Sequence, residues 1–460
     1  MVLNSQFLKD ILTDIVVVGP SFSLQTTVVD SRNVTSGSVF AALPGAVTDG
    51  HEYIEDALAR GACGIIAQKK YKNTVTELLR TYTEASAVFV DDVGDALYQV
   101  AQAWRAEFSI PVIGITGSIG KTTTRHMIVS VLENTGKKCL TPEKNYNTRI
   151  GIALTLFRLT DEHNYAVMEI GISRRGEMKF LAKLAKPTMG VITCVAHSHT
   201  AGLGSLSDIA HEKCALFSSF SEKNIGIING DQPELSGVSY FHPVVRFGYK
   251  TTNQVQARKI AINGVSTSFV LKVYGKKLPI TLPTVHEGAV INALACASVT
   301  HLLGIDMQHI VAGIQNCKVV PGRFELRPLA NKNGIVINDA YNANPESMRS
   351  ALLAFERLRT KGAKVAVLGD MLELGINAAY WHRQIGRHLR KTPSIKRLVL
   401  VGRYAQAVQK SLPPDIEVKI AGTWQEAKAF LAQDLQENAA ILVKASHGTG
   451  LENLVNDLAE

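Results

Sequence analysis

A glycine-rich segment spanning residues 113–123 indicates chemistry more directly than any other part of the chain. It reads IGITGSIGKTT, follows an apolar stretch and precedes a helical pattern. Glycines allow backbone N–H groups to point at phosphate oxygens, and the first turn of a helix adds positive potential. The usual G-x-x-x-x-G-K-T spacing fails by one position, because Ile115 takes the place of the first glycine and Gly114 precedes it. We still predict a phosphate-binding loop, in which Lys121 reaches the β- and γ-phosphates and Thr122 offers its hydroxyl to Mg²⁺.

Three polar residues lie close to the ends of later apolar patterns. Glu169 interrupts the segment AVMEIG, His199 follows ITCV, and Lys213 lies in the helical pattern after that. Taken singly, each has an ordinary structural interpretation, as a helix cap, a loop histidine and a solvated charge. The carboxyl ends of parallel strands, however, meet at the crevice where such sheets bind ligands. Together, and behind a phosphate-binding loop, the three residues predict a second metal position.

Strand and helix patterns alternate along most of the chain and predict an α/β fold. A first run begins at residue 111, and a second begins after Pro321-Gly322. Near-continuous apolar strands separated by helices indicate parallel sheets that are covered on both faces. The predicted strands are 111–116, 165–171, 189–195 and 224–229 in the first run, and 334–339, 364–369, 397–402, 418–422 and 439–445 in the second, which also contains a predicted helix over 345–360.

Two other regions do not show this regular alternation of strand and helix patterns. The N-terminal part mixes short strands with turns and a helix near 53–61, and residues 250–285 predict a small β region with a strand over 266–273. A helix starting near Ala289 follows. At about 100–200 residues per domain, a chain of this length suggests about three domains. We expect their bounds to be 1–106, 107–319 and 320–460.

The composition is that of an ordinary globular protein and excludes several classes. Hydrophobic residues make up 46% of the 460 residues and charged residues 19%, which excludes a collagen-like, low-complexity or disordered chain. The net charge of +9 comes from scattered basic residues, so it suits acidic small molecules, and we expect no nucleic-acid partner. The N-terminus does not have a signal-peptide pattern, and the apolar stretch 288–305 contains polar residues, so we predict a buried helix and no membrane insertion. Six separated cysteines without C-x-x-C predict reduced, mostly buried thiols in a cytoplasmic protein.

Further motifs follow one another over nearly the whole chain. They are DSR (30–32), GSVFAALPGAVTDGHEYIEDALARGA (37–62), EKNYNTRIG (143–151), MEIG (168–171), GLGSLSDIAHEK (202–213), PGR (321–323), DAYNANPESM (339–348) and LGDMLELG (368–375). With these motifs the sequence resembles the Mur ligase family, and within it the branch that adds D-alanyl-D-alanine to a UDP-N-acetylmuramoyl tripeptide. The resemblance implies a small α/β uridine-nucleotide-binding domain, a central P-loop α/β ATPase domain and a C-terminal Rossmann-like α/β domain.

The resemblance also implies roles for individual residues. ATP and two Mg²⁺ ions would be the cofactors, with Thr122 on the first ion, Glu169 and His199 on the second, and Lys213 carbamylated by CO₂ to supply anionic oxygens. Lys121, Glu169, His199 and Lys213 would form the catalytic set. The nucleotide would contact Gly117, Ser118, Ile119, Gly120, Lys121, Thr122, Thr123, Asn292, Arg323 and Asp339. The other substrates would contact Ser31, Arg32, Asn145, Asn147, Tyr341, Asn342, Asn344, Asp370, Glu373 and Lys444.

The chain departs from the family pattern at four places. The family's His-Asn before a helix becomes Gly288-Ala289, with Asn292 kept. Cys194 replaces an asparagine, Ala201 replaces a glutamate, and the usual Lys-Gly-Ser-Arg near the C-terminus reads KASH from Lys444. None of these changes touches the phosphate-binding loop, Glu169, His199 or Lys213. We expect intact chemistry with altered contacts to the nucleotide and the muramoyl substrate.

The implied reaction is ATP-driven amide synthesis through an acyl phosphate. Its partners would be UDP-N-acetylmuramoyl-tripeptide and D-alanyl-D-alanine, and we expect a cytoplasmic monomer. One alternative is another amide ligase, which adds a single amino acid to a muramoyl peptide or glutamate to folate, although the segment 30–62 argues against folate. A second alternative, from a different class, is a P-loop binding protein or regulatory ATPase that binds nucleotide without ligation.

Overall fold

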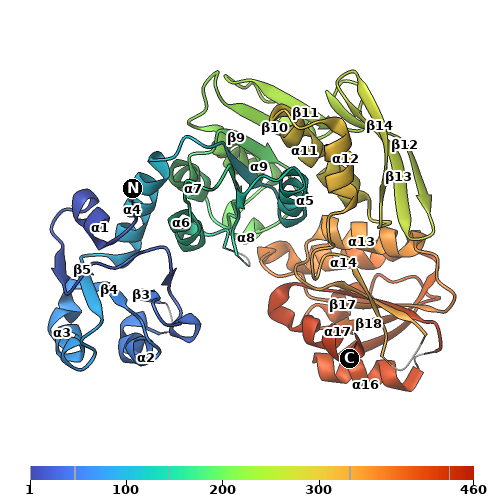
Figure 1. Cartoon of the computed structure of the whole chain (residues 1–460). Coiled ribbons are helices and arrows are strands. Elements are labelled where there is room, and N and C mark those ends of the chain that lie inside the picture. Colours follow the sequence, from blue (N-terminus) through green and yellow to red (C-terminus); the bar gives the residue numbers. More distant parts are fainter. Residues whose placement is uncertain (1, 46–47, 144–145, 331–332, 435, 460) are drawn as a thin grey trace. The chain divides into compact units, whose positions relative to one another are not determined.

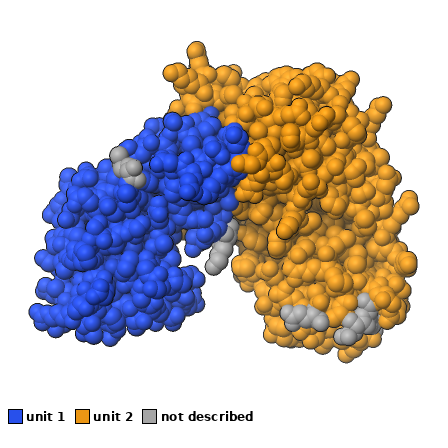
Figure 2. Space-filling view, in the orientation of Figure 1, with its two compact units in different colours: residues 1–114, 137–171, 179–188 blue, residues 115–136, 172–178, 189–460 orange. Residues whose placement is uncertain are grey.

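A computed structural model describes residues 2–45, 48–143, 146–330, 333–434 and 436–459. The chain divides into two compact units (Figure 2). The first contains residues 1–114, 137–171 and 179–188, and the second contains 115–136, 172–178 and 189–460. This division is not the one predicted from the sequence, whose bounds near 106 and 320 stay a prediction.

The first unit begins with a five-stranded sheet in the order β1-β5-β4-β3-β2. Its edge pair β1/β5 is antiparallel and the other pairs are parallel. Alternate residues of the central strands, such as Phe40, Ile65 and Phe89, pack against helices α2 and α3 and form a continuous core. The bounds are β1 Val16–Val18, β2 Thr27–Val28, β3 Val39–Ala41, β4 Gly64–Gln68, β5 Ser86–Val90, α1 Ser5–Ile11, α2 Ile54–Ala59, α3 Lys72–Thr81 and α4 Val93–Ala106.

Helix α4 joins this sheet to the later part of the same unit. Trp104 packs against Phe7 and donates its indole N–H to the carbonyl of Leu159 at 3.1 Å. The later part contains β7 (Cys139–Leu140), α6 (Arg149–Phe157) and β8 (Tyr165–Glu169), and β8 pairs in parallel with β7. Strand β6 (Val112–Thr116) and helix α7 (Glu177–Ala185) each run from one unit into the other.

The second unit carries strands β9 to β14 in consecutive order. Pairing is parallel from β9 to β12 and antiparallel from β12 to β14. The bounds are β9 Met189–Ile192, β10 Ile225–Asn229, β11 Val244–Gly248, β12 Val255–Asn263, β13 Ser266–Val273, β14 Lys276–Leu282, α5 Lys121–Glu133, α8 Thr200–Leu203, α9 Leu206–Cys214, α10 Pro233–Ser236, α11 Glu287–Leu302 and α12 Met307–Gln315.

The same unit ends in a six-stranded sheet ordered β15-β16-β20-β17-β18-β19. Along β17 and β20, alternate residues enter two separate cores, one with α13 and α14 and one with α16 and α17, which cover opposite faces (Figure 1). The bounds are β15 Glu325–Pro328, β16 Ile335–Asp339, β17 Lys364–Gly369, β18 Ile395–Val401, β19 Glu417–Ala421, β20 Ala440–Lys444, α13 Pro345–Arg357, α14 Ala378–His388, α15 Ala405–Gln409, α16 Trp424–Asp434 and α17 Leu451–Ala459.

Every predicted strand is present in the structure, within a few residues at its ends. The sequence did not predict the antiparallel edge strand β15, which pairs with β16. The expectation of mostly buried thiols is wrong, because only Cys296 is fully buried, although all six cysteines are free. In the described ranges no helix combines the length and the apolar character that crossing a membrane requires.

Candidate functional site

The phosphate-binding loop lies between the end of β6 and the start of α5, as predicted. Gly117 and Gly120 have φ values of 150° and 89°, in the region that favours glycine. A Cβ on Gly117 would lie 1.9 Å from the Thr193 hydroxyl, and one on Gly120 would lie 2.3 Å from the amide oxygen of Asn292. Both conformation and space therefore require glycine at these positions.

The segment after β9 holds the loop in place. The backbone N–H of Ser118 donates to the carbonyl of Cys194 at 2.8 Å, and the Ser118 hydroxyl donates to the carbonyl of Ala196 at 2.9 Å. Thr193 donates its hydroxyl to the carbonyl of Ile119 at 2.5 Å. Thr193 was not predicted from the sequence, where the one signal for it is that a polar residue follows an apolar strand. Lys121 donates from Nζ to the carbonyl of Gly117 at 2.9 Å, so its ammonium lies over the loop.

Lys213 lies on α9, which begins with a capping box between Ser205 and Asp208. Its side chain is buried, with 2% of the residue exposed, so the interpretation as a solvated charge is wrong. Burial, and next the nearby charge of Lys121, lower the pKa of Lys213 to about 7. Near neutral pH a large fraction of this amine is therefore uncharged and nucleophilic.

The structure brings His199 together with Glu373, which was predicted to contact a substrate. The His199 Nδ1 and a Glu373 carboxylate oxygen form an ion-pair contact, and the N–H of Ala201 donates to the Glu373 carbonyl at 3.2 Å. His199 and Glu373 both have positive φ, 52° and 61°. Burial lowers the pKa of His199 although Glu373 opposes the shift, which favours a neutral ring.

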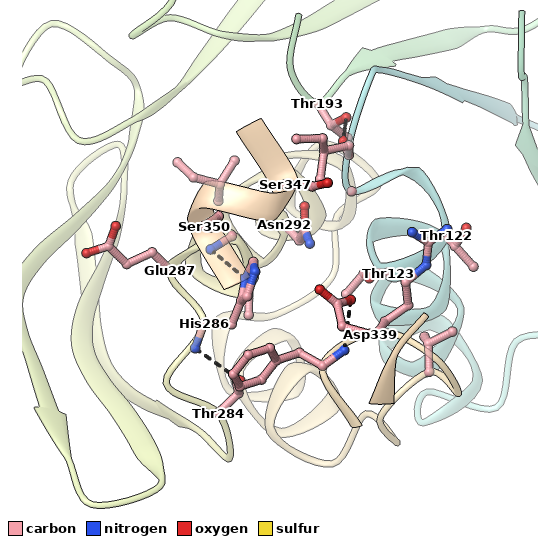
Figure 3. Close-up of a pocket in the computed structure, with 18 of the residues that line it drawn as sticks. Thr122, Thr123, Thr193, Thr284, His286, Glu287, Asn292, Asp339, Ser347 and Ser350 are labelled. Carbon is pink, nitrogen blue, oxygen red and sulfur yellow. Dashed lines mark hydrogen bonds between the residues drawn. The ribbon is translucent and has the colours of Figure 1, made fainter. Parts of the chain in front are cut away.

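A cavity of about 600 Å³ extends from the phosphate-binding loop to the C-terminal sheet. Its lining includes Gly120, Thr122 and Thr123 from the loop and Arg323 and Asp339 from the later sequence. Figure 3 shows Thr122 and Thr123 on one side of this cavity and the Asp339 carboxylate beside them. Predicted nucleotide residues from the loop and from the later sequence therefore line one cavity.

Asp339 and Lys444 end two neighbouring parallel strands and are paired in register. Their side chains form a 2.8 Å ion pair, and burial lowers the pKa of Lys444 although Asp339 opposes the shift. Lys444 also donates to the carbonyl of Asn342 at 3.0 Å. The predicted substrate residue Lys444 thus fixes the loop that follows Asp339. Other predicted residues nearby also make contacts within the chain. The Arg323 guanidinium lies over the Tyr341 ring at 4.0 Å, and Asn344 caps α13 by accepting from the N–H of Ser347 at 2.8 Å.

Several of the predicted residues belong to the first unit. Glu169 ends β8, is buried, and accepts from the side-chain amide of Asn147 at 3.2 Å. Arg32 is exposed and pairs with Asp30 at 2.7 Å, and the neighbouring Ser31 is buried. Asn145 lies outside the described residues. A metal set of Glu169, His199 and Lys213 stays a prediction, since these residues belong to different units.

Asp370 has a structural role that its motif did not reveal. Its two carboxylate oxygens accept the backbone N–H groups of Arg403 at 2.8 Å and Tyr404 at 3.0 Å. Asp370→Asn leaves one of these donors without an acceptor, so we expect the free energy of unfolding to fall by about 1–3 kcal/mol in urea titrations. Asp415→Asn, which changes an exposed aspartate in the turn before β19, is the control and should change stability little, because its ion pair with Lys396 lies on the surface. Equal stability of both variants would contradict the assignment.

Comparisons with known proteins agree with this geometry. Three family descriptions match in order, "Mur ligase family, catalytic domain" over residues 25–105, "Mur ligase middle domain" over 115–300 and "Mur ligase, glutamate ligase domain" over 322–447. The UDP-N-acetylmuramoyl-tripeptide–D-alanyl-D-alanine ligase of Bacillus subtilis is 33% identical over 94% of this chain and 92% of its own length. The ligase of that name from Escherichia coli is 31% identical over 98% and 97%.

Solved structures give the same result. MurF from Acinetobacter baumannii has a TM-score of 0.85 and 26% identity over 100% of this chain and 99% of its own. The MurF ligase of Thermotoga maritima in complex with ADP has a TM-score of 0.81 and 26% identity over 95% and 98%. The phosphate-binding loop lines one cavity together with Arg323 and Asp339. This geometry and the similarities together define the class of the protein, which is an ATP-dependent ligase. The chain belongs to the Mur ligase family and has its architecture of three α/β domains.

Proposed function

We propose that this chain joins D-alanyl-D-alanine to the terminal carboxylate of UDP-N-acetylmuramoyl-tripeptide, in the cytoplasmic synthesis of peptidoglycan precursors. The observation that carries the proposal is the shared cavity, in which the phosphate-binding loop and Arg323 and Asp339 face the same space. An ATP site divided in this way suits a ligase, because closure over ATP would exclude water from an activated intermediate. Similarity to ligases of this name over nearly the full length supports the choice of substrates. We expect the chain to act as a monomer.

The chemistry follows from the weak electrophilicity of a carboxylate. The terminal carboxylate of the tripeptide first attacks the γ-phosphorus of ATP, which forms an acyl phosphate and releases ADP. The free amine of D-alanyl-D-alanine then attacks the acyl carbon. The tetrahedral intermediate collapses to the amide as inorganic phosphate leaves and the amine loses a proton. In this scheme Lys121 orients the transferred phosphoryl group and Arg323 approaches the phosphates from the other wall.

The donor atoms suit Mg²⁺ at the first position, and a modified lysine would supply oxygen ligands at the second. Mg²⁺ prefers oxygen ligands, and the Thr122 hydroxyl lines the cavity beside the loop. Among the residues that the structure describes, no group of three histidine, cysteine or acidic side chains is placed to hold a metal ion. Bound Mg²⁺ would neutralise phosphate charge during phosphoryl transfer.

Lys213 is the residue that we propose to be modified. Its neutral amine would attack the carbon of CO₂, form an N–C bond and release one proton, leaving a carbamate anion with two oxygens. A cation buried near Lys121 would thereby become an oxygen ligand of the kind Mg²⁺ accepts. Glu169 and His199 complete the proposed second set.

The reaction is tested with purified protein, ATP, UDP-N-acetylmuramoyl-tripeptide and D-alanyl-D-alanine. We expect phosphate release that requires both other substrates and a pentapeptide product by mass spectrometry. Single amino acids offered in place of the dipeptide should give no product. Phosphate release without the dipeptide, or product with a single amino acid only, would contradict the proposal.

A further inference from the structure

The cavity is lined by both polar and apolar residues. Gly120, Thr122 and Thr123 line it at the phosphate-binding loop. The lining also includes Val265, Val319 and Leu326, which are exposed large apolar side chains. Exposed apolar side chains that face one cavity indicate a flat, weakly polar ligand group. A nucleotide whose phosphates lie on the loop would place its base elsewhere in the same cavity, where apolar side chains are available to cover it.

His286 is one of the titratable side chains that line this cavity. It precedes α11, lines the cavity beside Asn292 and lies with its ring 5.3 Å from the ring of Phe324 (Figure 3). Its Nδ1 accepts the backbone N–H of Gly288 at 3.1 Å, so the proton of a neutral ring is on Nε2. Burial lowers the pKa of His286 although Asp339 opposes the shift. The ring therefore presents an N–H donor at neutral pH.

The space next to this ring explains the glycine at position 288. A Cβ on Gly288 would lie 2.8 Å from Cε1 and 2.9 Å from Nδ1 of His286. A side chain at position 288 would therefore clash with the His286 ring in its observed position. The departure at Gly288 is therefore coupled to His286, whose ring occupies the space that a side chain would take.

We propose that His286 determines base specificity in this chain by donating an Nε2–H hydrogen bond to a ring nitrogen of adenine. The inference rests on the proposed function, because it takes the nucleotide to be the one that the ligase uses. The apolar side chains would cover the faces of the base, and the histidine would recognise its edge. His286 is on this account a specificity residue and takes no part in phosphoryl transfer.

The variant His286→Asn distinguishes the proposed hydrogen bond to adenine from the role of His286 as a helix cap. Asparagine is a strong N-cap, so the variant keeps an acceptor for the Gly288 N–H, but its shorter side chain does not reach as far into the cavity. We expect an unchanged melting temperature and a Kd for ADP, measured by calorimetry, that rises roughly five- to tenfold, as loss of one hydrogen bond predicts. The KM for ATP should rise by the same factor, while kcat at saturating ATP falls by less than twofold. His286→Ala, which removes cap and donor, should also lower the melting temperature.

Deaza analogues of ADP identify the acceptor. Wild-type protein should bind one of the 1-deaza, 3-deaza and 7-deaza analogues more weakly than ADP, and His286→Asn should bind that analogue and ADP equally. The proposal is overturned if His286→Asn binds ADP as tightly as wild type, or if wild type binds all three analogues as tightly as ADP. Since the readout is direct binding, a protein that passes this test but makes no pentapeptide would refute only the proposed function.

Discussion

Lys213→Ala is expected to lower kcat roughly 10²- to 10³-fold, the loss typical of removing one charge-stabilising group from an active site. The proposal gives Lys213 the role of an anionic oxygen ligand, which alanine does not supply. Truncation leaves an empty space where a buried side chain was, so acetate should restore part of the activity by bringing carboxylate oxygens to the same place. Steady-state phosphate release with and without acetate measures both effects.

Two further variants make this test specific. Lys213→Met fills most of the same volume without an amine, so it should be equally inactive and should not respond to acetate. Lys223→Ala removes an exposed lysine of the same unit and should keep wild-type activity. Full activity of Lys213→Ala, or equal rescue of the alanine and methionine variants, would show that the carbamate hypothesis is wrong.

The pH dependence of carbamate formation follows from the same residue. An unperturbed lysine has a pKa near 10.4, whereas that of Lys213 is lowered to about 7 by burial and by Lys121. Only the neutral amine reacts with CO₂, so the carbamate should accumulate as the pH rises through 7. With ¹³C-labelled bicarbonate, its NMR signal should grow between pH 6 and pH 8 and be absent in Lys213→Met.

Features set by local spacing were predictable from the sequence. The phosphate-binding loop needs glycines at fixed offsets before a lysine, and Gly117 and Gly120 are indeed required by conformation and by space. Buried strands are short apolar runs, so β16, β17 and β20 were located to within a residue or two. The edge strand β15 was missed because its residues alternate between half-buried and exposed and include Pro328, which gives no continuous apolar signal.

Features set by packing between distant segments were not predictable. Lys213 lies in the run HEKC, which looks polar in the sequence, and only its packing in the structure shows that the amine is buried and that its pKa is lowered. Asp370 belongs to a motif assigned to the substrate, yet it holds the backbone after β18. The sequence indicated only a lost contact at Gly288, whereas in the structure a Cβ at this position would lie 2.8 Å from the ring of His286.

Lys121→Met is expected to lower kcat roughly 10³-fold and also to change Lys213. The first effect comes from loss of the ammonium that stabilises charge on the transferred phosphoryl group. The second arises because the charge of Lys121 is the second cause, after burial, of the lowered pKa of Lys213. Without that charge the pKa of Lys213 should rise, so less of the amine is neutral at a given pH. The midpoint of the ¹³C carbamate signal should therefore move to higher pH.

Lys121→Arg is the matched control, because it keeps the positive charge but changes the geometry of the phosphate contact. It should lose much of the activity while the carbamate midpoint stays close to that of wild type. If both variants leave the midpoint unchanged, burial alone lowers the pKa of Lys213 and the two lysines act independently. If only Lys121→Met shifts it, the residue proposed to bind the phosphates also prepares Lys213 for reaction with CO₂, and the proximity of the two lysines couples nucleotide binding to assembly of the metal site.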